Sequence, residues 1–115
     1  MIYVKLNTLC VTNYADISIL LEIIDFQDST PLNLNGYTVH FTVKQTLTGV
    51  VKISKTVTNH LEPLDGQTLV EITKEDIETL EPGKYIYEVK LEDSDNKLTD
   101  FGQSDFIIEQ SLKTA

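Results

Sequence analysis

The chain has 115 residues, of which 41% are apolar and 23% are charged, and this composition fits one folded globular domain and excludes a disordered chain. Eighteen acidic residues outnumber nine lysines, there is no arginine, and the formal net charge is −9. Nucleic acids and anionic membrane surfaces attract clustered positive charge, so we expect neither as a partner. The single cysteine, Cys10, excludes an intrachain disulfide and is predicted to be a small buried hydrophobe.

The N-terminal part of the chain predicts two strands. It lacks the basic start and cleavage site of a signal peptide, so we expect synthesis in a cytoplasm. Residues 2–6 alternate weakly and predict an edge strand. Residues 16–26 predict a strand with one buried face, made of Ile17, Ile19, Leu21 and Ile23. Leu20 and Ile24 on the opposite face predict partial burial there too.

The middle of the chain continues with strands and turns. A turn at residues 28–31 precedes residues 37–44, which show the cleanest alternation of apolar and polar side chains. Residues 51–57 predict a lysine-bearing strand, and its lysines are typical of an edge strand or of an exposed face. Residues 59–67 predict a loop, and residues 68–73 a short strand. Thr73 followed by Asp76 is typical of a helix N-terminus, which predicts a short helical turn near residues 74–80.

The segment LEPGKYIYEVKLED at residues 80–93 predicts a long strand. Pro82 and Gly83 form a turn signal, after which alternate residues are apolar. A tyrosine just after a turn at the start of such a strand, here Tyr85, is typical of the tyrosine corner of immunoglobulin-like sandwiches. A hairpin turn at residues 93–96 leads to a last strand, residues 98–109, in which Gly102 predicts a bulge or kink.

Together these elements predict an all-β, immunoglobulin-like antiparallel β-sandwich of seven to eight strands. We expect a single domain over residues 1–109 and a polar C-terminal tail over residues 110–115. The predicted fold-defining core consists of Tyr37, Val39, Phe41, Tyr85, Tyr87, Val89, Phe106 and Ile108. Tyr3 and Tyr14 have less regular surroundings and are the candidates for an interface.

No residues are assigned to catalysis, to a cofactor or to a metal. His40 and His60 are isolated and are interpreted as surface side chains, and zinc would need three or four clustered ligands. The carboxylates of residues 93–96 are interpreted as a solvated hairpin, with a weak cation site as the alternative, because the distal glutamate of a calcium loop is missing. Asp76, Glu78 and Glu81 could act as general acid and base only across a cleft. We therefore predict that the protein is not an enzyme.

Three segments resemble the immunoglobulin-like domain at the N-terminus of bacteriophage baseplate upper proteins and related phage structural proteins. The segments are PLNLNGYTVHFTVK at 31–44, LEPGKYIYEVKLED at 80–93 and FGQSDFIIE at 101–109. The matching residues are Leu34, Gly36, Tyr37, Thr38, Val39 and Phe41, then Pro82, Gly83, Tyr85 and Tyr87, then Gly102, Phe106 and Ile108.

This resemblance implies a structural component of a virion, either in the baseplate or tail or associated with the capsid. Such a protein would be made in the bacterial cytoplasm and would assemble as a homo-oligomer or in many copies with other virion proteins. The alternative is a cell-surface or glycan-binding adhesion module, in which an end loop at residues 59–67 or 93–97 contacts carbohydrate.

Overall fold

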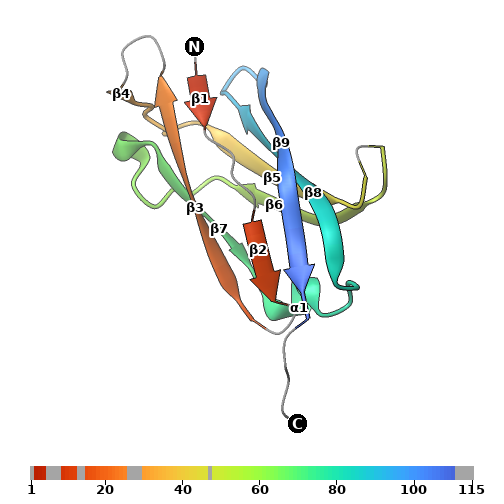
Figure 1. The fold of residues 1–115 in the computed structure, drawn as a ribbon. Helices are drawn as coiled ribbons and strands as arrows, with labels where there is room; N and C mark the ends of the chain where they lie inside the picture. The colour runs from red at the N-terminus through yellow and green to blue at the C-terminus, as the bar shows by residue number, and fades with distance from the viewer. Residues whose placement is uncertain (1, 5–8, 13–14, 26–29, 47, 111–115) are drawn as a thin grey trace.

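The protein folds as a sandwich of two β-sheets (Figure 1), seen here in a computed structural model. The structure describes residues 2–4, 9–12, 15–25, 30–46 and 48–110, and residues 2–4 only in their backbone. The predicted interface residue Tyr14, the side chain of Tyr3 and all but the first residue of the predicted tail lie outside the described part. No helix of the described residues is long and apolar enough to cross a membrane.

The smaller sheet is built around one central strand. Its strands are β1 (Ile2–Val4), β3 (Ile17–Asp25), β4 (Thr30–Pro31) and β7 (Gln67–Ile72). β3 pairs antiparallel with the other three, and β7 lies along its first six residues. The odd-numbered side chains of β3 face the core as predicted. The opposite face differs from the prediction, because Leu20 and Ile24 are 47% and 37% exposed and none of the described elements covers them as a second layer.

The larger sheet has the strand order β2-β9-β8-β5-β6. Its strands are β2 (Leu9–Thr12), β5 (Thr38–Lys44), β6 (Val51–Val57), β8 (Gly83–Glu92) and β9 (Leu98–Glu109). The lysine-bearing β6 lies at an edge, as predicted. β2 pairs parallel to β9 and was not predicted, because four residues are too few for a visible alternation.

The core lies between the two sheets and is organised around three aromatic rings. Phe41 and Tyr87 stack with centroids 5.3 Å apart, and Phe106 meets both of them edge-on. Such pairs contribute about 0.5–1.5 kcal/mol each beyond the area they bury. Seven of the eight predicted core residues are buried. Tyr37 is only partly buried, because it lies in the turn before β5 and packs at the margin of the core.

Two predicted local features connect the sheets. The helical turn is α1 (Lys74–Ile77), shorter than residues 74–80, and Thr73 caps it in a capping box with Asp76. The tyrosine corner is present at the start of β8, where the buried Tyr85 hydroxyl donates a hydrogen bond of 2.8 Å to the backbone carbonyl of Glu81. This bond closes the turn that carries the chain from one sheet to the other.

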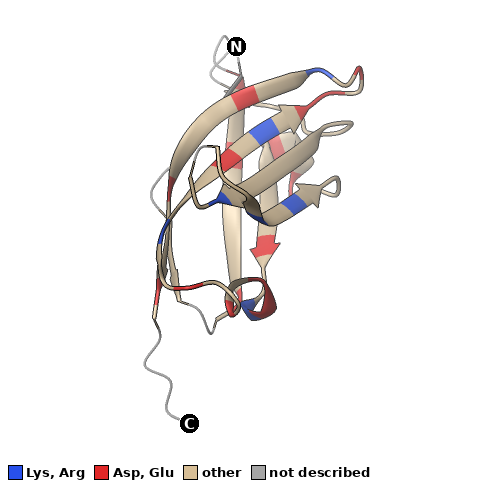
Figure 2. Ribbon diagram, turned by 90° about the vertical axis from the view of Figure 1, so that its right-hand side faces the viewer, with Lys and Arg blue, Asp and Glu red and all other residues tan. Residues whose placement is uncertain are grey.

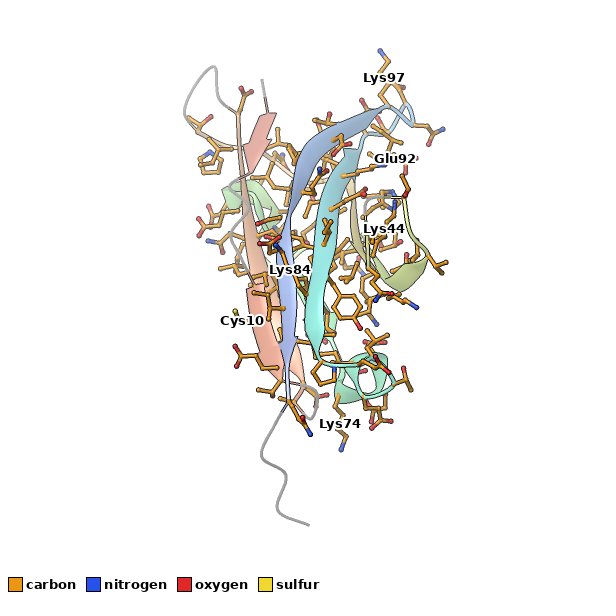
Figure 3. All side chains as sticks on the ribbon, turned by 45° about the vertical axis from the view of Figure 1, so that its right-hand side comes forward. Cys10, Lys44, Lys74, Lys84, Glu92 and Lys97 are labelled. Carbon is orange, nitrogen blue, oxygen red and sulfur yellow. The ribbon has the colours of Figure 1, made fainter. Side chains whose placement is uncertain are left out.

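The predicted bulge in the last strand is also present. The pairing of β8 with β9 shifts register between Glu88 and Lys90, opposite Phe101 and Gly102, and Gly102 has a φ of +88°. The side chain of Asp100 accepts a hydrogen bond from the Gly102 N–H at 2.8 Å. The prediction for Cys10 was wrong, because Leu9 and Val11 of β2 take the inward positions and Cys10 is exposed between them (Figure 3).

Candidate functional site

One edge of the smaller sheet is open beside β7. The backbone N–H and C=O of Gln67 point away from β3 and form hydrogen bonds of 3.0 and 3.1 Å with Glu62. Backbone groups repeat their direction every second residue of a strand, so those of Leu69 and Glu71 also point away from β3. No strand of the described residues pairs with this edge, which leaves a short template for another strand.

The open edge results from a short connection. In constant-type immunoglobulin domains a fourth strand covers the corresponding edge of the smaller sheet. Here the chain passes from β6 to β7 through residues 58–66, which contain the 3-10 turn η1 (Pro63–Asp65) and one isolated bridge between Glu62 and Gln67. This connection contributes one paired residue to the edge and no strand.

A groove of about 400 Å³ lies between β6 and β7 at this open side. It is lined by Lys55, Thr56 and Val57 of β6, by Asn59, His60 and Leu61 of the connection, and by Leu69 and Glu71 of β7. Its wall therefore combines three aliphatic side chains with polar groups from both sheets. The groove is shallow and open, in keeping with a bound chain segment more than with an enclosed small molecule.

His60 holds one wall of the groove in place. Its Nε2 lies 2.8 Å from the backbone carbonyl oxygen of Tyr37, which can only accept, so this nitrogen bears a proton. Its Nδ1 lies 2.8 Å from the hydroxyl oxygen of the buried Thr68. In the neutral ring, Nδ1 accepts a hydrogen bond from this hydroxyl. The interpretation of His60 as an ordinary surface side chain was incomplete, because both ring nitrogens are engaged in fixing the connection.

The cation of the groove is already paired. Lys55 Nζ lies 2.8 Å from Asp76 Oδ2, which joins β6 to the first turn of α1. Burial alone would raise the pKa of Asp76, but the hydrogen bonds from Lys55 and Thr73 and the charge of Lys55 together lower it. Asp76 therefore stays ionised and keeps the positive charge of Lys55 neutralised, and Glu71 makes no ion pair with another described residue.

Apolar side chains continue from the groove onto the outer face of the smaller sheet. Leu20 and Leu69 are cross-strand neighbours on this face. Leu61 and Leu64, in the connection that enters β7, are 54% and 69% exposed. Exposed leucines are ordinary when scattered, but a group next to an open strand edge is typical of an interaction surface.

The other sequence-derived candidates lie elsewhere. His40 pairs with Glu92 at 2.8 Å on the outer face of the larger sheet. Acidic and basic positions both occur along the strands of this sheet (Figure 2). Lys97 lies at the tip of the β8–β9 hairpin, and Lys74 at the opposite end of the molecule (Figure 3). The groove lining includes none of Asp76, Glu78 and Glu81, and Asp76 is engaged as a helix cap.

The carboxylates of the β8–β9 hairpin serve the turn itself. Asp93 Oδ1 accepts hydrogen bonds of 2.9 Å from the backbone N–H groups of Asp95 and Lys97, and Asn96 adopts a φ of +64°. This supports the solvated hairpin over the cation site that we kept as its alternative. Among the described residues, no group of three or more His, Cys, Asp and Glu is arranged to hold a metal ion.

The arrangement of its two sheets makes the chain an immunoglobulin-like β-sandwich. No protein-family model and no curated protein matches its sequence. The crystal structure of CopC from Methylosinus trichosporium OB3b is similar over 100% of both chains, at a TM-score of 0.57 and 10% identity. The soluble domain of PmoD from Methylocystis sp. ATCC 49242 (Rockwell) is similar over 94% of this chain and 89% of that one, at a TM-score of 0.53 and 12% identity.

A third solved structure, of the fibronectin(III)-like modules of CbhA from Clostridium thermocellum, covers 96% of this chain and 99% of that one at a TM-score of 0.47 and 15% identity. The similarity to CopC and to the PmoD domain, at 10% and 12% identity, shows a shared fold and leaves the role of this chain open. The function has to be argued from the residues of this chain.

The prediction of a phage virion component, and with it the virion location, is wrong. CopC and the PmoD domain are two solved structures that share this fold along its length, and neither is a phage structural protein. The residues behind the resemblance explain the error. Pro82 and Gly83 lie where the chain bends into β8, Tyr85 closes the corner, and Phe41 and Phe106 fill the core. Any β-sandwich of this kind needs such residues for its fold, so their presence does not indicate a particular function.

The groove was not found in the sequence, although one signal for it was present. Residues 59–67 were correctly predicted as a loop. A loop of that length, broken by Pro63 and by Gly66, is too short to supply the missing edge strand. Only the strand order of the two sheets shows that β7 needs such a cover.

Proposed function

We propose that the chain is a non-catalytic protein-binding module whose β7 edge accepts an extended polypeptide segment as an additional strand. The observation behind this proposal is the open edge at Leu69 and Glu71, bordered by the groove between β6 and β7. Strand addition of this kind obtains affinity from main-chain hydrogen bonds and specificity from the alternate side chains of the ligand.

The surroundings of the edge favour this mode of binding. An added strand would complete the ladder that the bridge between Glu62 and Gln67 begins. One set of its side chains would cover Leu69 and extend the apolar outer face, and the other set would enter the groove beside Val57. Burial of this apolar surface contributes about 25 cal/mol per Å² to the free energy of binding, in addition to the main-chain hydrogen bonds. The cost of ordering the ligand offsets part of this gain.

Other classes of function find less support in the same residues. Both ring nitrogens of His60 are engaged, and Lys55 is paired with Asp76, so the groove offers Glu71 without a second free titratable group. General acid–base chemistry needs a pair of groups within reach of a substrate. The absence of arginine and the net charge of −9 argue against nucleic acid and anionic membranes as ligands.

Proline at position 71 tests the proposal. The Glu71 N–H points away from β3, so Glu71→Pro removes one donor from the open edge and leaves the ladder to β3 intact. Glu71→Thr is the matched control, because it also removes the charge but keeps the N–H. Peptides selected by the natural chain from a random 12-residue library should bind Glu71→Thr and lose at least tenfold in affinity for Glu71→Pro, measured by calorimetry.

Circular dichroism and the melting temperature establish that both variants remain folded. The proposal is overturned when the library yields no binders. It is equally overturned when a folded Glu71→Pro protein binds the selected peptides as tightly as Glu71→Thr does.

A further inference from the structure

We infer that the segment bound at β7 runs antiparallel to it and has a lysine or arginine two residues before a large apolar residue. This inference rests on the proposed function and names the chemistry of its ligand. It follows from three features of the edge: the direction of its backbone groups, the charge of Glu71 and the apolar surface at Leu69.

The direction of the ligand follows from the backbone. Leu69 and Glu71 each present an N–H and a C=O on the same side, and an antiparallel partner would form both hydrogen bonds through the one residue directly opposite. Parallel pairing has slanted hydrogen bonds and is slightly less stable per residue. The bridge that the chain itself forms at this edge, between Glu62 and Gln67, is also antiparallel. An incoming strand that continues this ladder keeps the same direction.

The charge of the ligand follows from Glu71. This side chain is exposed on the outer face and makes no ion pair with another described residue. The groove cation Lys55 is held by Asp76 and cannot neutralise it. Glu62 and Asp65 add negative charge near the other end of the open edge. A cationic residue directly opposite Glu71 forms a favourable cross-strand pair, whereas an acidic one is destabilising.

The apolar position of the ligand follows from Leu69. In an antiparallel strand, the residue opposite Leu69 comes two residues after the one opposite Glu71 and lies on the same face. There it would pack on Leu69 and towards Leu20, which is its exposed neighbour on β3. The residue between them faces the groove near Val57, where a β-branched side chain fits the available volume of about 400 Å³. From its N-terminus, the ligand therefore has a basic residue, then a residue that faces the groove and is best β-branched, then a large apolar residue.

A second copy of this chain fits the edge poorly. Two β7 strands paired antiparallel about Val70 would place Leu69 of one copy opposite Glu71 of the other, and β7 contains no lysine to meet that carboxylate. Each copy also has a net charge of −9, so approach of the two is opposed by repulsion. The poor fit of two β7 edges and the repulsion between two acidic copies together favour a basic segment of a different protein as the ligand.

Capped synthetic peptides test this inference. The probe has the core Thr-Lys-Thr-Leu-Thr between Gly-Ser ends, and two comparison peptides replace Lys by Glu or exchange the places of Lys and Leu. Each is titrated into isotopically labelled protein while the backbone amide signals of Leu69 and Glu71 are followed by NMR. We expect the Lys peptide to bind about two- to fivefold more tightly than either comparison peptide.

Charge reversal in the protein provides the control. Glu71→Lys should invert the preference so that the Glu peptide binds more tightly, whereas Glu109→Lys, an equal charge change on the larger sheet, should leave the preference as it is. Equal affinities for the Lys and Glu peptides, or no inversion in Glu71→Lys, overturn the inference alone, since binding at the edge would persist. If no peptide shifts the Leu69 and Glu71 amides, the inference and the proposed function fail together.

Discussion

Tyr85 combines two roles in one side chain at the start of β8. Its ring is buried in the core, and its hydroxyl holds the preceding turn through the Glu81 carbonyl at 2.8 Å. Burial, with the negative charge of Glu81, raises its pKa, so the hydroxyl keeps the proton that this bond needs. Because the pKa is raised in the folded state, the stabilisation is complete below pH 10 and is lost as the pH rises further.

Substitution separates the two roles. Tyr85→Phe removes the hydrogen bond and keeps the ring, so it should lower the free energy of unfolding by about 1 kcal/mol. Tyr85→Ala also empties the core position and should lower it by about 3–5 kcal/mol. Urea denaturation at pH 7 measures both values. Equal losses for Phe and Ala would mean that the ring contributes nothing to the core.

Asp76 links β6 to α1 through a charge. Its pKa is lowered because the hydrogen bonds from Lys55 and Thr73 outweigh the effect of burial. A lowered pKa stabilises the fold above the unfolded value of about 3.8, and this contribution disappears as the pH falls below it. Asp76→Asn should therefore cost about 1 kcal/mol at pH 7 and almost nothing at pH 2.

The test compares the urea midpoints of the natural chain and Asp76→Asn from pH 6 to pH 2. The difference between the two proteins isolates Asp76 from the other carboxylates, which titrate in both. A difference that stays constant over this range would rule out an ionised Asp76 as its source.

At the scale of elements, the sequence predicts strands whose side chains alternate for several residues. β3, β5 and β8 satisfy this, and they form the centre of the two sheets. β2 has only four residues and is defined by its pairing with β9. The local sequence pattern does not indicate such a pairing with a distant strand. Leu20 and Ile24 were predicted to be partly buried because they are apolar. The pattern within one strand does not show whether another layer covers its second face. The groove escaped prediction for the same reason, since it depends on a strand order that only tertiary packing defines.

Gly66 marks the place where the connection joins β7. It has a φ of +68°, its carbonyl accepts from the Ile23 N–H at 2.8 Å, and a Cβ there would collide with the carbonyl oxygen of Ile23. Gly66→Ala should destabilise the fold by well over about 1 kcal/mol. Gly36→Ala is the control, because Gly36 has a φ of +85° but no heavy atom near its added Cβ. A thermal melt in which both variants lose equal stability would show that the close approach is relieved without cost.

At the scale of the whole molecule, the two outer faces differ. The larger sheet presents paired charges, among them Lys44 with Glu88 and Lys84 with Asp105. The smaller sheet presents leucines beside an open edge. Paired charges keep a surface solvated and contribute little stability, whereas an apolar face next to unpaired backbone groups favours contact with another chain. This asymmetry directs binding to the smaller sheet.

The net charge of −9 acts on the molecule as a whole. In 10 mM salt the Debye length is about 30 Å, which exceeds the shortest extent of the molecule, 22 Å, so charges on opposite faces interact. In 150 mM salt the Debye length is about 8 Å, and only neighbouring charges still interact. Screening weakens both the surface ion pairs and the general repulsion. We expect the screening of the repulsion to have the larger effect on the free energy of unfolding, because exposed ion pairs contribute only between zero and about 1 kcal/mol each.

The free energy of unfolding should therefore rise between 10 and 150 mM sodium chloride at pH 7, as measured by urea denaturation. A variant with Glu75, Glu78 and Glu109 replaced by glutamine provides the control, because all three side chains are exposed and the change removes three negative charges. Its stability should depend less on salt than that of the natural chain. A natural chain that loses stability as salt is added would show that its ion pairs outweigh the repulsion, and that the acidic surface is stabilised by local pairing.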